Sequence, residues 1–532
     1  MTAAANRLFV NGEIHTLAAP DETHEAVAVR DGAIVRIGST REVEFLEGVD
    51  TDVVDLDGRV LLPGFVDAHT HLTTVGRYLV HADLSAADSP DEAVDLLAER
   101  AAEVAEADPG GEDTDGERTG DEWVLGYGYD ESTWDEDRYL TREDLDRVST
   151  ERPVAAFRED MHVAAVNGVV LDRFADELSA VPDETVPTDD AGEPTGVRLE
   201  AAIDPIYGAV EPGPAATREI VAAALEDCAA KGITGFHDMV RNSHAPRAYR
   251  ELDAAGELTA RVRINYWSDH LDALREVGLP TNAGSDMVET GAIKSYTDGS
   301  FGGRTARLSE PYADAPDETG QWVVDPEGLA ETVAEATEAG YQFTAHAIGD
   351  EAVDAVLDAY EGASATDPGE ARHRIEHVEL ADDAAIERLA DSGVVASVQP
   401  NFLKWAGEDG LYEARLGPER TAATNRYRDM LDAGANLAFG SDGMPMDPLL
   451  GVHHAVNAPA AAQRLTVTEA LRAYTRGAAY AGFDEDRLGT VAVGKRADLV
   501  ALDASPWANP GAIRDVDVAM TVVDGEVVYD GR

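Results

Sequence analysis

Four histidines, one lysine and one aspartate stand in short apolar segments in a fixed order along the chain. The segments read FVDAHTH, AIKSYTDG, FTAHAIGD, RIEHV and LAFGSD, and their polar residues include His69, His71, Lys294, His346, His377 and Asp442. Imidazole nitrogens and carboxylate oxygens are ligands that catalytic divalent metals take in proteins. The residue types and their order therefore indicate a metal-dependent hydrolase.

The first two histidines are two residues apart, so on a strand both rings project from the same face. Asp67 is on that face as well and could orient a histidine ring from behind. A pair of half-buried histidines is the alternative interpretation, and the histidines and acid downstream favour metal binding. Strand alternation predicts that Glu376, next to His377, points to the opposite face as a packing or helix-side partner.

Lys294 calls for an explanation because the chain has only four lysines, at positions 231, 294, 404 and 495. A strand lysine usually reaches water or pairs with an acid. A cationic ammonium among metal ligands would be repelled, whereas a neutral amine that has taken up carbon dioxide becomes an anionic carbamate. Its two oxygens can bridge two cations, and burial favours the neutral amine. We therefore predict a carbamylated Lys294.

The remaining ligands complete a site for two divalent ions. His346 and His377 would supply nitrogen ligands to a second metal, while Asp442 can touch one metal and accept a proton. Mixed nitrogen and oxygen ligands with an open position favour Zn²⁺, with Mn²⁺, Fe²⁺ and Ni²⁺ as alternatives.

The elements that must position these residues are parallel strands. Eight short apolar runs, seven of them alternating with helical stretches after Gly232, predict a (β/α)8 barrel, whose active site forms at the carboxyl ends of its strands. The β-rich segments at both chain ends share Asn-Gly and Asp-Gly turns and predict one small β-sandwich. The expected divisions are residues 1–62 (sandwich), 63–485 (barrel, with an insertion at about 75–210) and 486–532 (sandwich).

Composition limits the partners and the compartment. The net charge of -62 arises from 104 acidic and 42 basic residues, a balance that is typical of halophiles and disfavours nucleic acid and membranes as partners. The single Cys228 excludes an intramolecular disulfide, and neither a signal peptide nor a transmembrane run is visible. We expect a cytoplasmic protein, and we interpret the acidic stretch near 108–122 as a mobile surface loop of open role.

The motifs together resemble the amidohydrolase superfamily. PGFVDAHTH, the strand lysine, HAIGD, RIEH and GSD follow its order, and WVLGYGYDESTW, DMHVAAVN, TDGSFGGRTA, LTVTEALRAYT and LGTVAVGKRADLV are similar to amidohydrolase family 3, which includes N-substituted formamide deformylase-like proteins. The resemblance implies one metal on His69 and His71, a second on His346 and His377, a bridging Lys294, and Asp442 as acid and base.

Substrate-binding residues are predicted on weaker signals. Tyr127, Trp134 and His162, all in the insertion, could roof the barrel mouth, with packing of the insertion as the alternative for the aromatic residues. His237 ends the second strand, beside Asp238, and could line the pocket or pack in the core. Arg304 could clamp a carboxylate or pair with an acidic neighbour.

The predicted reaction is hydrolysis of a non-peptide carbon–nitrogen bond in a small molecule, such as an N-formyl, N-acyl or cyclic amide. Hydrolysis of an ester, lactone or phosphoester by the same site is the alternative. A non-catalytic scaffold is a third reading, which the presence of all six ligands disfavours. The barrel and sandwich surfaces could also support a homo-oligomer.

Overall fold

The computed structural model describes residues 4–19, 21–107, 111–112, 118–119, 123–159, 162–178, 181–182, 185–189, 191–363 and 368–532. The chain forms two compact units: Met1–Leu72 with Leu225–Arg532, and Thr73–Ala224. In the described part of the chain, no helix combines the length and the apolar character needed to cross a membrane.

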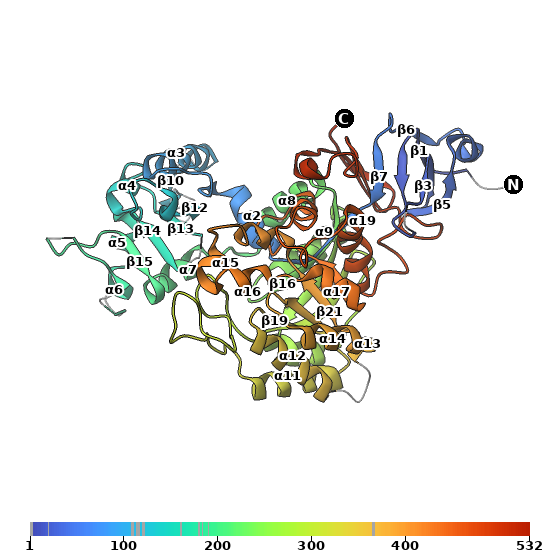
Figure 1. Ribbon diagram of the computed structural model, residues 1–532. Coiled ribbons are helices and arrows are strands. Elements are labelled where there is room, and N and C mark those ends of the chain that lie inside the picture. The colour runs from blue at the N-terminus through green and yellow to red at the C-terminus, as the bar shows by residue number, and fades with distance from the viewer. Residues whose placement is uncertain are drawn as a thin grey trace. The chain divides into compact units, whose positions relative to one another are not determined.

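The larger unit contains the predicted barrel, an eight-stranded parallel sheet in the order β22-β21-β20-β19-β18-β17-β16-β8 (Figure 1). All eight apolar runs that the sequence predicted as strands are strands, and the fold class is confirmed. Their bounds are β8 Phe65–Thr70, β16 Ile233–Val240, β17 Arg261–Trp267, β18 Val288–Tyr296, β19 Phe343–Ala347, β20 Arg374–His377, β21 Val395–Val398 and β22 Asn436–Phe439.

The helices between the strands have one apolar face, and some of them begin at a residue whose side chain caps the helix. Helix α11 (Pro326–Glu338) has Asp325 at its N-cap, whose side chain accepts from the Gly328 amide, and Pro at its first turn. Leu329, Val333 and Ala336 are its buried residues, at the spacing of one helix face. Helices α12 (Asp350–Ala363), α14 (Asp383–Ser392) and α17 (Tyr427–Ala433) bury apolar residues in the same way.

Backbone contacts join the last strand to the first. The amides of Ser441 and Asp442, just after β22, both donate to the carbonyl of His69 in β8, at 3.1 and 2.7 Å. Gly440 permits this approach, since a Cβ at that position would lie 2.4 Å from the His69 nitrogen. The closure therefore places Asp442 directly beside the His69 segment.

The two chain ends meet in neighbouring sheets, as the sequence predicted. The six-stranded sheet runs β25 (Glu526–Asp530), β24 (Val518–Val523), β23 (Leu499–Leu502), β7 (Val60–Pro63), β2 (Glu13–His15), β3 (Thr23–His24). The four-stranded sheet runs β5 (Ala33–Gly38), β4 (Ala26–Arg30), β1 (Arg7–Val10), β6 (Asp52–Asp55). Phe9, Val27, Leu61, Leu499 and Met520 belong to one shared core. Only Gly64 separates the end of β7 from the first barrel strand, so the sandwich leads directly into the barrel.

The smaller unit, Thr73–Ala224, includes the insertion that the sequence predicted at about 75–210. Its five-stranded sheet runs β15 (Val197–Leu199), β14 (Val163–Val166), β13 (Val154–Arg158), β12 (Val124–Tyr129), β9 (Ala82–Asp83), and has an apolar cluster on each face. Of the acidic stretch near 108–122, the described residues form only the short pair β10 (Gly111–Glu112) and β11 (Arg118–Thr119). The rest of that predicted loop lies outside the described residues.

Candidate metal centre

Side chains from different strands converge at the carboxyl ends of the barrel strands. A ligand atom from each of His69, His377 and Asp442 lies within 4.8 Å of the others, close enough for all three to belong to one metal centre. His71 Nε2 also lies 3.4 Å from Asp442 Oδ1, and the His346 ring centroid lies 4.5 Å from that of His377. These five residues come from β8 and the position just after it, from β19 and β20, and from the turn after β22, and they form one cluster.

The two histidines of the first strand present their Nε2 atoms to Asp442. His69 Nδ1 donates to Glu376 Oε2 at 2.7 Å, and His71 Nδ1 donates to the carbonyl of Met239 at 3.1 Å. In each ring Nδ1 therefore carries a proton, and when the ring is neutral its Nε2 has the lone pair that a metal needs. The Nε2 atoms of His69 and His71 lie 3.3 and 3.4 Å from Asp442 Oδ1.

The other two histidines differ in how they are held. His346 Nε2 donates to the carbonyl of Gly299 at 3.0 Å, so its Nδ1 is the nitrogen left to accept or coordinate. His377 Nδ1 is buried and has no hydrogen-bond partner among the described residues. Burial first, then the neighbouring imidazoles, holds the pKa of His377 well below its ordinary value. A neutral ring is the form that binds metal.

Lys294 lies in β18 with a fully buried Nζ that has no hydrogen-bond partner in the described part of the structure. Burial lowers the pKa of Lys294 to about 8, against an opposing effect of the Glu376 and Asp442 carboxylates. An unpaired ammonium in such a place is costly. The buried Lys294 amine and the buried His377 nitrogen both lack a hydrogen-bond partner in the described residues, as expected of groups that would bind metal ions.

Asp442 is the carboxylate at the centre of the cluster. Burial opposes its charge, but attraction and a hydrogen bond from His69, followed by attraction from His71 and His377, hold its pKa well below its usual range. It is therefore ionised and acceptor-only at neutral pH. A carboxylate in this state can bind a cation and can receive a proton.

The prediction for Glu376 was wrong, because its side chain points into the barrel and holds the His69 ring. The cause is local: His377 and Val378 have φ of 77° and 48°, so the strand ends at His377 and the alternation of faces stops there. Glu376 shares the inner face with Arg374, two residues before it, and the two form an ion pair. The motif RIEH contained this acid, but the alternation rule assigned it to the wrong side.

Asp67 also has a role different from the predicted one. Its Oδ1 accepts from the backbone amides of His69 and Ser441, both at 3.0 Å. The carboxylate thus holds the backbone at the junction of the first and last strands, and the contact to the His69 ring comes from Glu376.

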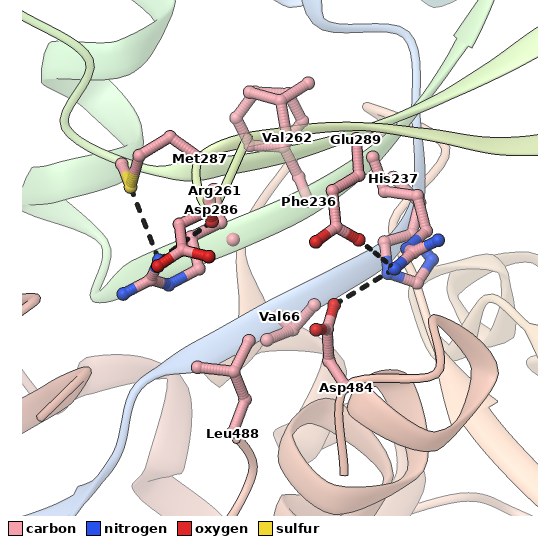
Figure 2. A pocket seen from close by; sticks show the side chains of 12 residues that line it. Val66, Phe236, His237, Arg261, Val262, Asp286, Met287, Glu289, Asp484 and Leu488 are labelled. Carbon is pink, nitrogen blue, oxygen red and sulfur yellow. Dashed lines mark hydrogen bonds and ion pairs between the residues drawn. The ribbon is translucent and has the colours of Figure 1, made fainter. Parts of the chain in front are cut away.

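His237 was predicted to end its strand and line the pocket, but β16 continues to Val240 and places it deeper in the barrel. Its Nδ1 accepts from Arg374 Nη1 at 2.8 Å. His237 also lines a small pocket together with Glu289, Asp484 and the first residues of β17 (Figure 2). This is the opposite end of the strands from the metal cluster, so the packing alternative describes His237 better than the substrate-binding one.

The remaining predicted substrate residues are engaged within the chain. Tyr127 is buried and stacks on Phe157 with centroids 5.0 Å apart, and buried Trp134 donates to the carbonyl of Ala87. These contacts fit the packing alternative. His162 is exposed and lies 3.0 Å from a carboxylate oxygen of Glu200.

Arg304 forms two hydrogen bonds with Asp314, at 3.1 and 2.7 Å. Its guanidinium is therefore already paired with an acidic neighbour, which was the alternative to a substrate clamp.

Comparison with known proteins identifies the family to which the chain is similar. Residues 52–529 match the amidohydrolase family. The chain is 33% identical to the putative amidohydrolase YtcJ of Bacillus subtilis, and the alignment covers 98% of this chain and 99% of that protein. It is 26% identical to an N-substituted formamide deformylase of Arthrobacter pascens, and that alignment covers 100% of this chain and 99% of the relative. Among solved structures, an uncharacterized metal-dependent hydrolase from Pyrococcus furiosus is 29% identical, with a TM-score of 0.77 and coverage of 94% of this chain and 99% of that one.

Proposed function

The chain belongs to the amidohydrolase family, and from this premise we propose that it hydrolyses a non-peptide carbon–nitrogen bond in a small molecule. The observation that carries the proposal is the convergence of His69, His377 and Asp442 within 4.8 Å at the carboxyl ends of the barrel strands. Amide substrates, with N-formyl, N-acyl and cyclic amides as the candidates, are favoured by the similarity to a formamide deformylase.

The proposed ligands are His69 and His71 for one divalent ion and His346 and His377 for another, with a carbamylated Lys294 that would bridge the two and Asp442 as a ligand of one of them. The carbamate forms when the neutral amine of Lys294 adds carbon dioxide and releases one proton. Zn²⁺ suits this mixture of nitrogen and oxygen ligands, with Mn²⁺, Fe²⁺ and Ni²⁺ as alternatives. Bound divalent ions lower the pKa of water and polarise a carbonyl group.

The residues of the chain then supply positioning and proton transfer. Asp442 takes a proton from the attacking water while the oxygen of that water forms a bond to the substrate carbon. The same carboxyl returns a proton to the nitrogen as the carbon–nitrogen bond breaks. In the short turn after β22 the backbone amide of Asp442 donates a hydrogen bond to the carbonyl of His69, so that the carboxylate stays beside His69 and His71.

A hydrolysis panel tests the proposal. Protein equilibrated in molar KCl is treated with chelator, reloaded with Zn²⁺, and offered N-formyl, N-acyl and cyclic amides beside esters, lactones and phosphoesters. Mass spectrometry should detect amine and acid products that disappear with chelator and return with metal. Turnover confined to esters, lactones or phosphoesters would replace the amide assignment, and a metal-loaded protein without turnover on any class would favour a scaffold.

A further inference from the structure

A buried ion pair lies in the barrel interior behind the proposed ligands. Arg374 and Glu376 are both in β20, and both side chains are completely buried. Arg374 Nη2 lies 2.8 Å from Glu376 Oε1. Neither residue is one of the proposed metal ligands, and a buried pair of charges needs compensating hydrogen bonds to persist.

Both oxygens of Glu376 have defined partners. Oε2 accepts from His69 Nδ1 at 2.7 Å, while Oε1 accepts from the hydroxyl of Thr344 and pairs with Arg374. A carboxylate on the far nitrogen of a metal-binding imidazole fixes its tautomer and ring orientation and strengthens it as a ligand. Glu376 stands in that relation to His69, whose Nε2 faces Asp442.

Arg374 is fixed in turn by three other strands. Nη1 donates to His237 Nδ1 in β16 at 2.8 Å, and Nη2 donates to Ser397 Oγ in β21 at 2.9 Å and to the carbonyl of Ala68 in β8. Ala68 immediately precedes His69. One guanidinium thus contacts both the backbone before His69 and the carboxylate that holds its ring.

We propose that Arg374 and Glu376 form a positioning unit for the metal centre, which holds His69 with Nδ1 protonated and Nε2 directed at the ions. The inference rests on the proposed function, since it concerns the affinity of that same site. Glu376 determines the direction of the His69 ring, and Arg374 determines the place of Glu376. The competing explanation is a pair that contributes only to barrel stability.

The test is zinc affinity, measured as zinc bound per chain across a series of buffered free Zn²⁺ concentrations. Glu376→Gln removes the charge at nearly constant shape, and Glu376→Asp keeps the charge but withdraws it from His69. Both should bind zinc about 10- to 100-fold more weakly than the wild type. The visible absorption of the Co²⁺-loaded protein should also change, because ring orientation alters the ligand field.

The control is Glu289→Gln, which removes a carboxylate paired with Arg263 and Arg487 at the other end of the barrel. It should retain wild-type zinc affinity and the wild-type Co²⁺ spectrum. Circular dichroism checks the fold of each variant. If Glu376→Gln does not fold, the zinc affinity and Co²⁺ spectrum of Glu376→Asp test the positioning role.

Wild-type affinity and spectrum in a folded Glu376 variant would overturn the positioning unit alone. A wild-type protein that binds no zinc would instead contradict the proposed function. The two failures are therefore distinguishable in one set of titrations.

Discussion

Backbone angles at two of the proposed ligands differ from those of ordinary strand residues. His377 has a φ of 77° and Asp442 a φ of 58°, in the left-handed region that side chains other than glycine rarely adopt. Such conformations cost free energy and concentrate at functional sites. In both cases the strand has just ended, so the turn, and not the strand pleat, sets the direction of the side chain.

Asp442→Asn should abolish most turnover while it retains the fold and much of the bound metal. An amide cannot take a proton from water, and loss of a general base typically lowers rates by about 10²- to 10⁴-fold. Steady-state kcat with the preferred amide, alongside metal content, measures the effect. Asp503→Asn, in the surface pair with Arg59, is the matched control. Wild-type turnover in Asp442→Asn would remove this residue from its proposed role.

At this scale the sequence was informative about residue types and much less about directions. The six proposed ligands could be chosen because each ends an apolar run. The direction of the Glu376 side chain could not be predicted, because the sequence RIEH does not reveal the positive φ at His377. The depth of His237 was also misjudged, because Met239 and Val240 extend its strand beyond the apparent end.

At the scale of elements, the chain just after β22 approaches β8 closely at Gly440. Gly440→Ala would place a Cβ 2.4 Å from the His69 nitrogen and 2.8 Å from its Cβ. The backbone would have to move, and displacements of about 1 Å at a catalytic group can cost about 10²-fold in rate. We expect lower metal content and about 10²-fold lower kcat/KM, measured on purified protein.

Gly362→Ala is the control for this substitution, because that glycine lies in helix α12 with open space around it. It should be neutral or slightly stabilising. Full metal content and activity in Gly440→Ala would show that the contact between the two strands does not position the site.

The segment between β19 and β20 provides a test by pH. His373 is buried, accepts from the Phe343 amide at 3.0 Å, and lies 3.1 Å from the Thr337 hydroxyl. Burial lowers the pKa of His373 from 6.5 to about 4. Between these values the unfolded chain binds a proton that the folded chain does not, so the stability from this group is present above pH 6.5 and is lost as pH falls towards 4.

His373→Gln should remove this dependence while it keeps an acceptor for the Phe343 amide. Denaturant unfolding at several pH values from 7 to 4 should show a wild-type free energy of unfolding that falls more steeply, by about 1.4 kcal/mol per pH unit, than that of the variant. Parallel pH profiles for the two proteins would contradict the assignment of a neutral buried His373.

The presence of the barrel strands was the most predictable part of the fold. Buried parallel strands are continuous apolar runs, so all eight could be found, and turn residues at both chain ends indicated the sandwich. The five-stranded sheet of the insertion was not predicted. Its strands pair partly in parallel, between segments far apart in the sequence, and no local turn marks such pairing.

At the scale of the whole molecule, the net charge of -62 is the dominant feature. Arginines are set among groups of acids: Arg388, for example, pairs with Asp354, Asp358 and Glu361. The acids still outnumber the basic residues more than twofold, and their mutual repulsion destabilises the compact state. Salt shortens the range of this repulsion, from about 10 Å at 0.1 M to about 3 Å at 1 M.

The melting temperature should therefore rise by several degrees between 0.1 M and molar KCl. Circular dichroism melts across a KCl series measure the effect, and sodium chloride at matched ionic strength separates screening from specific potassium binding. A melting temperature that stays constant or falls with salt would contradict the interpretation of the charge as an adaptation to a salt-rich environment.

The most direct test of the account is metal content per chain, for wild-type protein and Lys294→Ala purified in molar KCl. Lys231→Ala, a lysine paired with Asp227, serves as the control. We predict about two metal ions per wild-type and control chain, and a sharp fall in Lys294→Ala, as a bridged pair of ions requires. One ion in all three proteins would contradict the bridging lysine, and no metal in the wild type, even after reconstitution, would contradict the metal-dependent hydrolase itself.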